Sequence, residues 1–235
     1  MKVVALFSGG KDSMYSLWIA SSFGWEVKTL LSMLPESDSS FMFHRPNVEW
    51  VPLQAEAMDL PLIMQRSSGE KLRELDDLKS LMQSVKVDGI VTGAVASEYQ
   101  KEKVDMICEE LGLCSFSPLW HKEGEQLLRE MVGAGFEIMI TSVSAAGFDE
   151  SWLGRRIDEK CVEELLELRR RYGISVVGEG GEMETFVTDA PSFKKKIKIK
   201  KTEKSWDGVR GVLEIRDAEL VSRSERETPH SSEVG

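Results

Sequence analysis

The chain has 235 residues, long enough to bury a sizeable hydrophobic core in one large domain or two smaller ones. Hydrophobic residues make up 41% of the sequence and charged residues 30%, which excludes collagen-like, low-complexity and wholly disordered chains. The 30 Lys and Arg residues are outnumbered by 40 Asp and Glu residues, giving a formal net charge of -10. This balance argues against a nucleic-acid partner held by phosphate neutralisation.

The cysteines and the first residues bear on the compartment. Cys108, Cys114 and Cys161 form no CxxC pair and have no zinc-ligand spacing, so a reducing compartment fits best. The apolar start at residues 1–7 is too short for a secretory signal or a membrane span. We therefore expect a cytoplasmic chain with no membrane partner.

The first half of the chain alternates between the two secondary-structure periods. Short apolar runs rich in β-branched residues predict strands, and apolar residues at helical spacing predict helices. In chain order we expect strand 3–7, helix 12–23, strand 27–34, a polar loop at 35–46, helix 50–58, strand 62–64, helix 70–85, strand 89–92, helix 97–112 and strand 113–116. This alternation predicts an α/β fold with a doubly wound, parallel, five-stranded sheet of the nucleotide-binding type, with ligands at the carboxyl ends of its strands.

The pattern changes after residue 118. We expect helix 123–134, strand 136–143, helix 158–172 and two β-rich stretches at 193–201 and 209–220. Asp207 and Gly208 between these stretches are a hairpin turn signal. We therefore divide the chain into an ATP-binding domain at 1–126, a smaller α+β substrate-binding domain at 127–222 and a mobile tail at 223–235.

Residues 8–13 lie between the first strand and the first helix. Glycines there let phosphate oxygens approach backbone amides, the serines add hydroxyl donors, and Lys11 adds a positive charge. Asp12 fits an anion site if a Mg²⁺ ion bridges it to the phosphates. The plain alternative is a Ser/Gly turn with an acidic residue in the first turn of the helix.

Two further segments carry candidate binding residues. Gly93 and residues 97–100 form a second glycine turn and helix start beside the first one, although Ser97 and Gln100 also fit a helix-capping box. In residues 178–186, three carboxylates alternate with glycines, a composition that disfavours both helix and ordinary strand. We interpret this segment as a binding loop, the alternative being a solvated acidic turn.

The segment SGGKDS resembles the fingerprint of the PP-loop family of ATP pyrophosphatases. The resemblance implies cleavage of ATP between its α- and β-phosphates, transfer of AMP to a substrate oxygen, and displacement of AMP by ammonia or sulfur. It implies catalytic roles for Lys11 and Asp12, with Asp12 also a Mg²⁺ ligand through the phosphates. It implies that ATP and pyrophosphate are bound by Ser8, Gly9, Gly10, Lys11, Asp12, Ser13 and Gly93.

A wider set of motifs is similar to the diphthine-ammonia ligase family. They lie at residues 8–13, 42–47, 93–100, 118–120, 154–158 and 179–186. The resemblance implies ATP-dependent amidation of diphthine on translation elongation factor 2 with ammonium, through an acyl-adenylate. It implies substrate contacts from Ser97, Glu98, Tyr99, Gln100, Glu179, Gly180, Gly181, Glu182 and Glu184. Lys103 and Met183 depart mildly from what we expect in many relatives.

Several assignments stay open at this stage. The trimethylammonium group of diphthine favours an aromatic or acidic pocket. The candidates are Trp120, Phe148, Trp152, Glu182 and Glu184, and the alternative for each aromatic residue is core packing. The lysine run at 194–201 predicts a strand with one solvated basic face, or alternatively a docking stripe. His44 and His121 are candidates for acid/base catalysis, but their aromatic or proline neighbours favour the alternative that they pack or form hydrogen bonds.

Three other functions compete with this interpretation. A PP-loop enzyme acting on tRNA would favour paired cysteines and a basic surface, and neither is present. A ligase for a metabolite carboxylate differs only in substrate, and a non-catalytic ATP-binding sensor would bind ATP without releasing AMP. The size of the chain also leaves a homodimer open.

Overall fold

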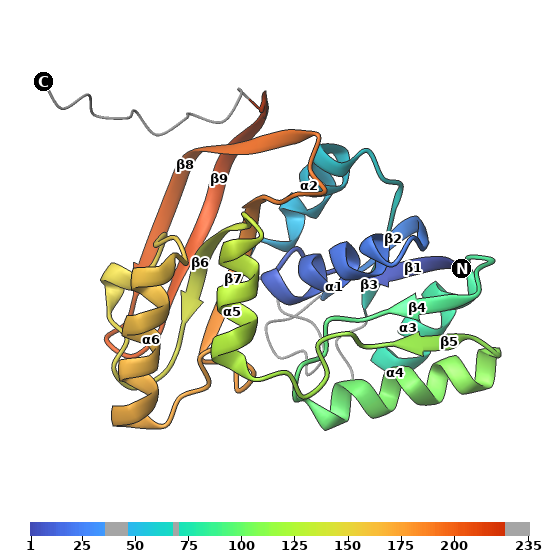
Figure 1. The fold of residues 1–235 in the computed structure, drawn as a ribbon, viewed down its shortest axis with the longest axis horizontal. Coiled ribbons are helices and arrows are strands. Elements are labelled where there is room, and N and C mark those ends of the chain that lie inside the picture. Colours follow the sequence, from blue (N-terminus) through green and yellow to red (C-terminus); the bar gives the residue numbers. More distant parts are fainter. Residues whose placement is uncertain (36–46, 68–70, 224–235) are drawn as a thin grey trace, which may run out of the picture.

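The structure, a computed structural model, describes residues 1–35, 47–67 and 71–223 (Figure 1). The expected loop at 36–46, with His44 and most of the 42–47 motif, lies outside these ranges, as does the expected tail beyond Arg223. The described residues form two sheets, one built before residue 117 and the other after residue 136.

The first sheet is five-stranded and entirely parallel, as the alternating pattern predicted. Its order is β3-β2-β1-β4-β5. The strands are β1 (Lys2–Leu6), β2 (Glu26–Pro35), β3 (Leu62–Ser67), β4 (Gly89–Val91) and β5 (Cys114–Phe116). The helical segments are α1 (Lys11–Ser22), η1 (Val48–Trp50), α2 (Val51–Met58), α3 (Lys71–Gln83) and α4 (Glu98–Leu111). Because β1 and β4 are neighbours, the loops that follow them lie side by side.

Helices cover both faces of this sheet. Side chains of a strand point alternately to its two faces, so Val3 and Val4 of β1 belong to different apolar clusters. Val4 packs with residues of α3 and α4, and Val3 packs with residues of α1 on the opposite face. Each fully buried aliphatic side chain contributes roughly 1.5–3 kcal/mol of hydrophobic stabilisation, so the two clusters fix both layers of helices against the sheet.

The second sheet has four strands in the order β7-β6-β9-β8 with antiparallel pairing. Its strands are β6 (Glu137–Val143), β7 (Met183–Asp189), β8 (Lys195–Trp206) and β9 (Gly211–Ser222), with α5 (Gly124–Gly133), η2 (Glu150–Trp152) and α6 (Glu159–Tyr172) as helical segments. Buried residues of α5, α6 and this sheet join the same cluster as α1, so one continuous core runs from the first sheet to the second. The proposed domain boundary at residue 126 falls within α5 and stays a prediction.

One strand contradicts the sequence analysis. Residues 183–186 were expected to resist a strand, but they open β7, which pairs with β6. Met183 and Phe186 are buried, and their packing with the β6 pairing outweighs the unfavourable local composition. The expected hairpin at Asp207 is confirmed, because its side chain accepts hydrogen bonds from the backbone N–H groups of Val209 (2.9 Å) and Arg210 (2.7 Å).

The second sheet opens between β6 and β9, and η1 fills the gap. β6 pairs with β9 only through Ser142 and Val143. Beyond these pairs, Asn47 donates from its side-chain amide to the carbonyl of Leu213 (2.9 Å) and accepts from the N–H of Ile215 (2.7 Å). These bonds satisfy backbone groups of β9 that β6 leaves free, and they tie the start of η1 to the second sheet.

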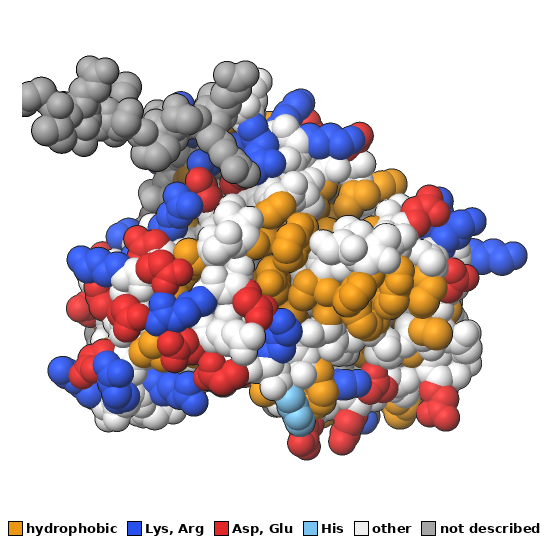
Figure 2. Space-filling model, in the orientation of Figure 1, with side chains coloured by type: hydrophobic (Ala, Val, Ile, Leu, Met, Phe, Trp, Pro, Cys, Tyr) orange, Lys and Arg blue, Asp and Glu red, His pale blue; other side chains and the backbone are white. Residues whose placement is uncertain are grey.

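Charged and apolar side chains gather on different parts of the surface. Figure 2 shows hydrophobic side chains over the region where α1 lies in Figure 1, and Lys, Arg, Asp and Glu over α6. The lysine run forms most of β8 as an exposed edge strand, which confirms the strand interpretation. Within residues 1–35, 47–67 and 71–223, no helix combines the length and the apolar character needed to cross a membrane.

Candidate functional site

A cavity of about 200 Å³ lies where the carboxyl ends of β1, β2 and β4 meet the start of β7. It is the position that a doubly wound sheet offers for ligands. The sequence-predicted site residues that line it are Ser8, Gly10, Lys11, Asp12, Ser13, Gly93, Gln100, Glu179 and Glu184. The rest of the lining is mostly apolar, including Leu6, Phe7, Leu31, Met33, Val48, Leu78 and Val104.

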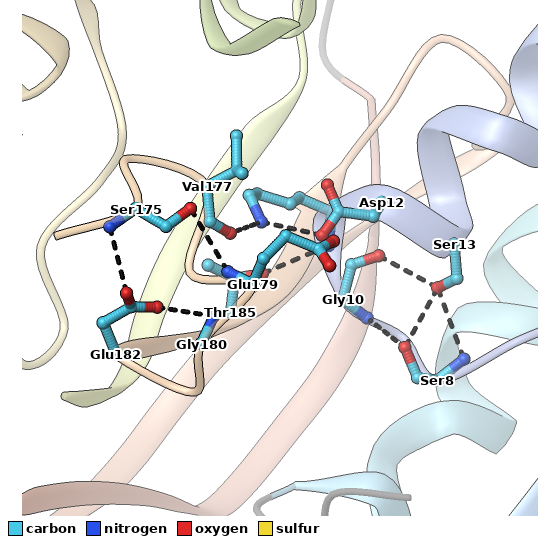
Figure 3. A network of polar contacts seen from close by, with 11 residues as sticks. Ser8, Gly10, Asp12, Ser13, Ser175, Val177, Glu179, Gly180, Glu182 and Thr185 are labelled. Atoms are coloured by element: carbon cyan, nitrogen blue, oxygen red, sulfur yellow. Dashed lines mark hydrogen bonds and ion pairs between the residues drawn. The ribbon is translucent and has the colours of Figure 1, made fainter. Parts of the chain in front are cut away.

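The 8–13 loop is shaped by its own hydroxyl groups. The Ser13 hydroxyl donates to the carbonyl of Gly10 (3.0 Å) and accepts from the N–H of Ser8 (3.3 Å), as Figure 3 shows. The two serine hydroxyls lie 3.2 Å apart. α1 starts at once after this turn, and its N-cap Gly10 makes no side-chain cap. The first turn of α1 therefore presents a helix N-terminus to the cavity, which favours an anion.

Residues from elsewhere in the chain hold the same loop. The Gln54 side chain of α2 is fully buried, and its amide donates to the carbonyls of Gly9 and Val187, both at 2.9 Å. The N–H of Val187 also donates to the carbonyl of Gly9 (3.2 Å). Gly9 itself has φ +83°, and a Cβ there would lie 2.4 Å from the Gln54 side-chain oxygen. Gln54 was missed from the sequence, where the signal was a long polar side chain in a mostly apolar helix.

Gly93 brings the second loop against the first. A Cβ at Gly93 would lie 2.7 Å from the backbone nitrogen of Ser13, closer than Cβ atoms approach in proteins. Only glycine permits this contact between the β4–α4 loop and the start of α1. The structure therefore brings the two predicted glycine turns together at one edge of the cavity.

Lys11 and Asp12 form a partly buried ion pair. The Lys11 side chain is 3% exposed, and its ammonium donates to Asp12 Oδ2 (2.8 Å) and to the carbonyl of Val177 (2.5 Å). Asp12 Oδ1 is buried and has no hydrogen-bond partner among the described residues. A buried carboxylate oxygen without a donor is costly, and a Mg²⁺ ion would satisfy it. Asp12 thus fits the role of metal ligand that the sequence suggested.

Among the described residues, the cavity wall carries more negative than positive charge. Three carboxylates, of Asp12, Glu179 and Glu184, line it with one ammonium, of Lys11. Burial raises the pKa of Glu179, and the nearby Asp12 carboxylate raises it further, while hydrogen bonds from the backbone of Ala96 and Val95 oppose the shift. Within the described ranges, no group of three His, Cys, Asp or Glu side chains could hold a metal ion by itself. A polyphosphate bound here would need a cation to offset the carboxylates.

The side chain of Glu182 turns back onto its own loop, residues 178–182. Its carboxylate accepts from the N–H groups of Ser175 (3.0 Å) and Gly180 (2.7 Å). The N–H of Gly181 closes a turn onto the carbonyl of Gly178 (3.0 Å). Figure 3 shows this arrangement, in which Glu182 points toward Ser175. Gly180, Gly181 and Glu182 shape the 178–182 loop without lining the cavity, whereas Glu179 of the same loop lines it.

The residues at the start of α4 also differ in whether they line the cavity. The Ser97 hydroxyl caps the helix by accepting from the N–H of Gln100 (3.4 Å), which confirms Ser97 as the N-cap. Gln100 lines the cavity. Glu98 is exposed outside it, and Tyr99 lies with its ring 5.7 Å from the ammonium of Lys103.

The aromatic candidates for a cation cage do not line the cavity. Phe148 and Trp152 are buried and meet edge to face with centroids 5.0 Å apart, and Arg155 lies 4.6 Å from the Trp152 ring. This geometry favours the core-packing alternative for both. Trp120 stacks on His121 at 4.5 Å. The acidic side chains, rather than these aromatics, therefore offer the cavity's attraction for a cation.

Comparisons with known proteins place both halves of the chain in one family. A sequence model of the diphthamide synthase N-terminal domain matches residues 1–115, and one of the C-terminal domain matches residues 123–221. The chain is 38% identical to the diphthine–ammonia ligase of Rattus norvegicus over 86% of this chain and 84% of that one. It is 36% identical to the Homo sapiens protein of that name over 94% and 92%, and 36% identical to that of Danio rerio over 86% and 88%.

A solved structure, a predicted subunit of tRNA methyltransferase from Methanocaldococcus jannaschii, covers 81% of this chain and 98% of its own. With a TM-score of 0.42 and 14% identity, this similarity supports no conclusion about the chain. The two family models and the curated relatives, in contrast, account for nearly the whole chain. The chain therefore belongs to the diphthine–ammonia ligase family, also called diphthamide synthase.

Proposed function

We propose that the chain amidates the carboxyl group of diphthine on translation elongation factor 2, using ATP and ammonium and releasing AMP and pyrophosphate. The observation that carries the proposal is one cavity that combines the 8–13 loop with the carboxylates of Glu179 and Glu184. The loop suits the phosphates of ATP, and the carboxylates suit the cationic partners of the reaction, which are ammonium and the trimethylammonium group.

The first proposed step forms an acyl-adenylate. The substrate carboxylate attacks the α-phosphate, the bond to the β-phosphate breaks, and pyrophosphate leaves. Charge develops on the leaving group, and we expect the N-terminus of α1 and the hydroxyl of Ser8, which lines the cavity, to stabilise it. Asp12 would hold Mg²⁺, which when bound supplies positive charge to the phosphates.

The second proposed step forms the amide. Ammonia attacks the acyl carbon, AMP leaves, and the nitrogen loses a proton. This step needs placement of two reactants and exclusion of water rather than a nucleophilic cysteine. The cysteines agree with this requirement, because none of them lines the cavity, and burial raises the pKa of Cys108 and of Cys161 to about 11.

One reaction mixture tests the proposal. The purified chain is incubated with ATP, Mg²⁺, ammonium and elongation factor 2 carrying diphthine, while nucleotides and the mass of the modified peptide are followed. We expect AMP, pyrophosphate and the mass of the amide only when ammonium is present. AMP without the amide would point to another carboxylate substrate, and ATP binding without AMP would point to a sensor.

A further inference from the structure

Thr185 reaches the 8–13 loop from the second sheet. It lies in β7 and lines the cavity. Its hydroxyl oxygen accepts a hydrogen bond of 3.1 Å from the backbone N–H of Lys11, the first residue of α1. Because Gly10 provides no side-chain cap, the hydroxyl of Thr185 serves as the cap of this helix across 174 positions of sequence.

The direction of this hydrogen bond leaves one group of Thr185 unused. A hydroxyl accepts through its oxygen and donates one hydrogen. Thr185 accepts from Lys11, and among the described residues its own hydrogen has no acceptor. Ser13, in contrast, gives its hydrogen to the carbonyl of Gly10. The free donor of Thr185 therefore lies on the cavity wall beside the N-terminus of α1.

The surroundings keep Thr185 close to the turn. A Cβ at Gly10 would lie 3.5 Å from the Thr185 hydroxyl and 3.4 Å from its carbonyl, so β7 packs directly on the loop. The neighbouring bond from the N–H of Val187 to the carbonyl of Gly9 fixes the same strand against the same loop. Figure 3 shows Thr185 across from Gly10. A phosphate group at the start of α1 would therefore lie within reach of this hydroxyl.

We propose that Thr185 is a phosphate-binding residue of the nucleotide site, which accepts from the N–H of Lys11 and donates its own hydrogen to a phosphate oxygen of ATP and of the departing pyrophosphate. The proposal rests on the proposed function, because it assumes that the 8–13 loop binds these phosphates. It assigns part of the phosphate site to the second sheet, outside the PP-loop motif.

A purely structural role for Thr185 predicts the opposite effect on binding. If the hydroxyl only caps α1, its removal frees the N–H of Lys11 for a phosphate oxygen, and pyrophosphate affinity stays equal or rises. If the hydroxyl donates to phosphate, its removal loses a charge-assisted hydrogen bond and affinity falls. The two roles therefore differ in the sign of the change.

The test compares four full-length proteins: wild type, Thr185→Val, Thr185→Ser and Thr188→Val. Valine keeps the branched shape that suits β7, and serine keeps the hydroxyl. Thr188 lies on the same strand but donates to the carbonyl of Glu137 (3.3 Å) and does not line the cavity, so its valine variant is the matched control. Affinities for ATP, pyrophosphate and AMP with Mg²⁺ are measured by titration calorimetry, and thermal unfolding checks that each variant folds.

We expect Thr185→Val to weaken ATP and pyrophosphate binding by roughly 10- to 100-fold, with AMP affinity changed less than about twofold. Thr185→Ser should restore most of the affinity, and Thr188→Val should match wild type. Pyrophosphate affinity of a folded Thr185→Val protein equal to or above that of wild type would overturn the assignment.

A failure of the proposed function has a different signature. A wild type that binds pyrophosphate in a Thr185-dependent way but forms no amide would refute the amidation reaction and leave the phosphate assignment in place. A wild type that binds neither ATP nor pyrophosphate would remove both.

Discussion

The 8–13 loop and the 178–182 loop meet at the same cavity, and both combine glycines with a carboxylate, yet they are held in different ways. The carbonyl of Gly9 receives hydrogen bonds from Gln54 of α2 and Val187 of β7. The 178–182 loop is held by Glu182, which accepts from the N–H groups of Ser175 and Gly180, and by Ser144, whose hydroxyl and N–H donate to the carbonyls of Gly181 and Glu182. The 8–13 loop is bonded by its own serine hydroxyls and by the distant Gln54, whereas in the 178–182 loop a carboxylate of the loop itself binds the loop's backbone.

The carboxylates of the two loops differ accordingly. Asp12 keeps one buried oxygen without a donor, Glu182 uses both of its oxygens on the backbone, and Glu179 lies in the cavity wall. Acidic residues close in sequence thus hold different positions in the site. This difference predicts that the properties that change, whether catalysis, ligand binding or stability, will depend on which residue of the two loops is substituted.

The largest effect is expected for Asp12→Asn. Asparagine keeps the shape of the side chain but removes the charge that would hold Mg²⁺. We expect pyrophosphate release to fall by at least about 100-fold, as for loss of one preorganised electrostatic contact, with little change in melting temperature. Asp59→Asn is the control, because Asp59 forms an exposed ion pair with Lys194 away from the cavity. Pyrophosphate release by Asp12→Asn at the wild-type rate would exclude a role for this carboxylate.

Gly9→Ala tests the loop that distant residues hold. Its positive φ costs an alanine about 1–3 kcal/mol, and the added Cβ would collide with Gln54. We expect a lower free energy of unfolding in urea and weaker ATP binding. Gly24→Ala separates the two causes, since Gly24 has φ +75° but nothing within 4 Å of its Cβ position. If the two variants lose the same stability, then Gln54 yields freely and does not hold the loop.

Glu182→Ala tests the 178–182 loop. It removes both hydrogen bonds to the backbone, each contributing about 1.5–3 kcal/mol when the acceptor is charged, less where solvent reaches the group. We expect faster amide hydrogen exchange at Ser175 and Gly180, with exchange in β1 and α1 unchanged. Exchange that accelerated equally in the 8–13 loop would show that the two loops are coupled, contrary to the comparison.

Much of the first region could be predicted from sequence because its signals are local. Glycines, hydroxyls and a strand-to-helix change mark the 8–13 loop, and Gly93 marks the second turn. Parallel strands bring such turns to one edge whatever the side chains in between. The cavity position follows from the same rule.

The remainder depends on tertiary contacts. Gln54 and Thr185 act on the 8–13 loop across long sequence separations, and no local pattern announces such contacts. β7 forms against its own composition because β6 offers a partner. The motif at 154–158 does not line the cavity. The N–H of Ile157 donates to the carbonyl of Ile138 in β6, and the carboxylate of Asp158 caps α6 by accepting from the N–H of Cys161. A sequence motif marks constrained positions without telling whether chemistry or folding constrains them.

The smallest expected effect is a pH-dependent gain of stability in Glu179→Gln. Burial and the nearby Asp12 raise the pKa of Glu179 in the folded chain above its ordinary value. At pH below that ordinary value the carboxyl is protonated in both states, and it costs no stability. As pH rises toward the folded pKa, the unfolded chain ionises first, so the folded state loses stability until the pH exceeds the folded pKa.

Glutamine carries no charge and escapes this loss. The free energy of unfolding of Glu179→Gln relative to wild type should therefore grow between the two pKa values and stay constant above the higher one. Glu56→Gln, at an exposed position of α2, corrects for the general loss of one negative charge. A difference that stayed flat over this pH range would mean that Glu179 is not destabilised in the cavity wall. A stability gain joined to weaker amidation would show that this loop holds its carboxylate for function at a cost to folding, whereas Glu182 beside it stabilises the fold.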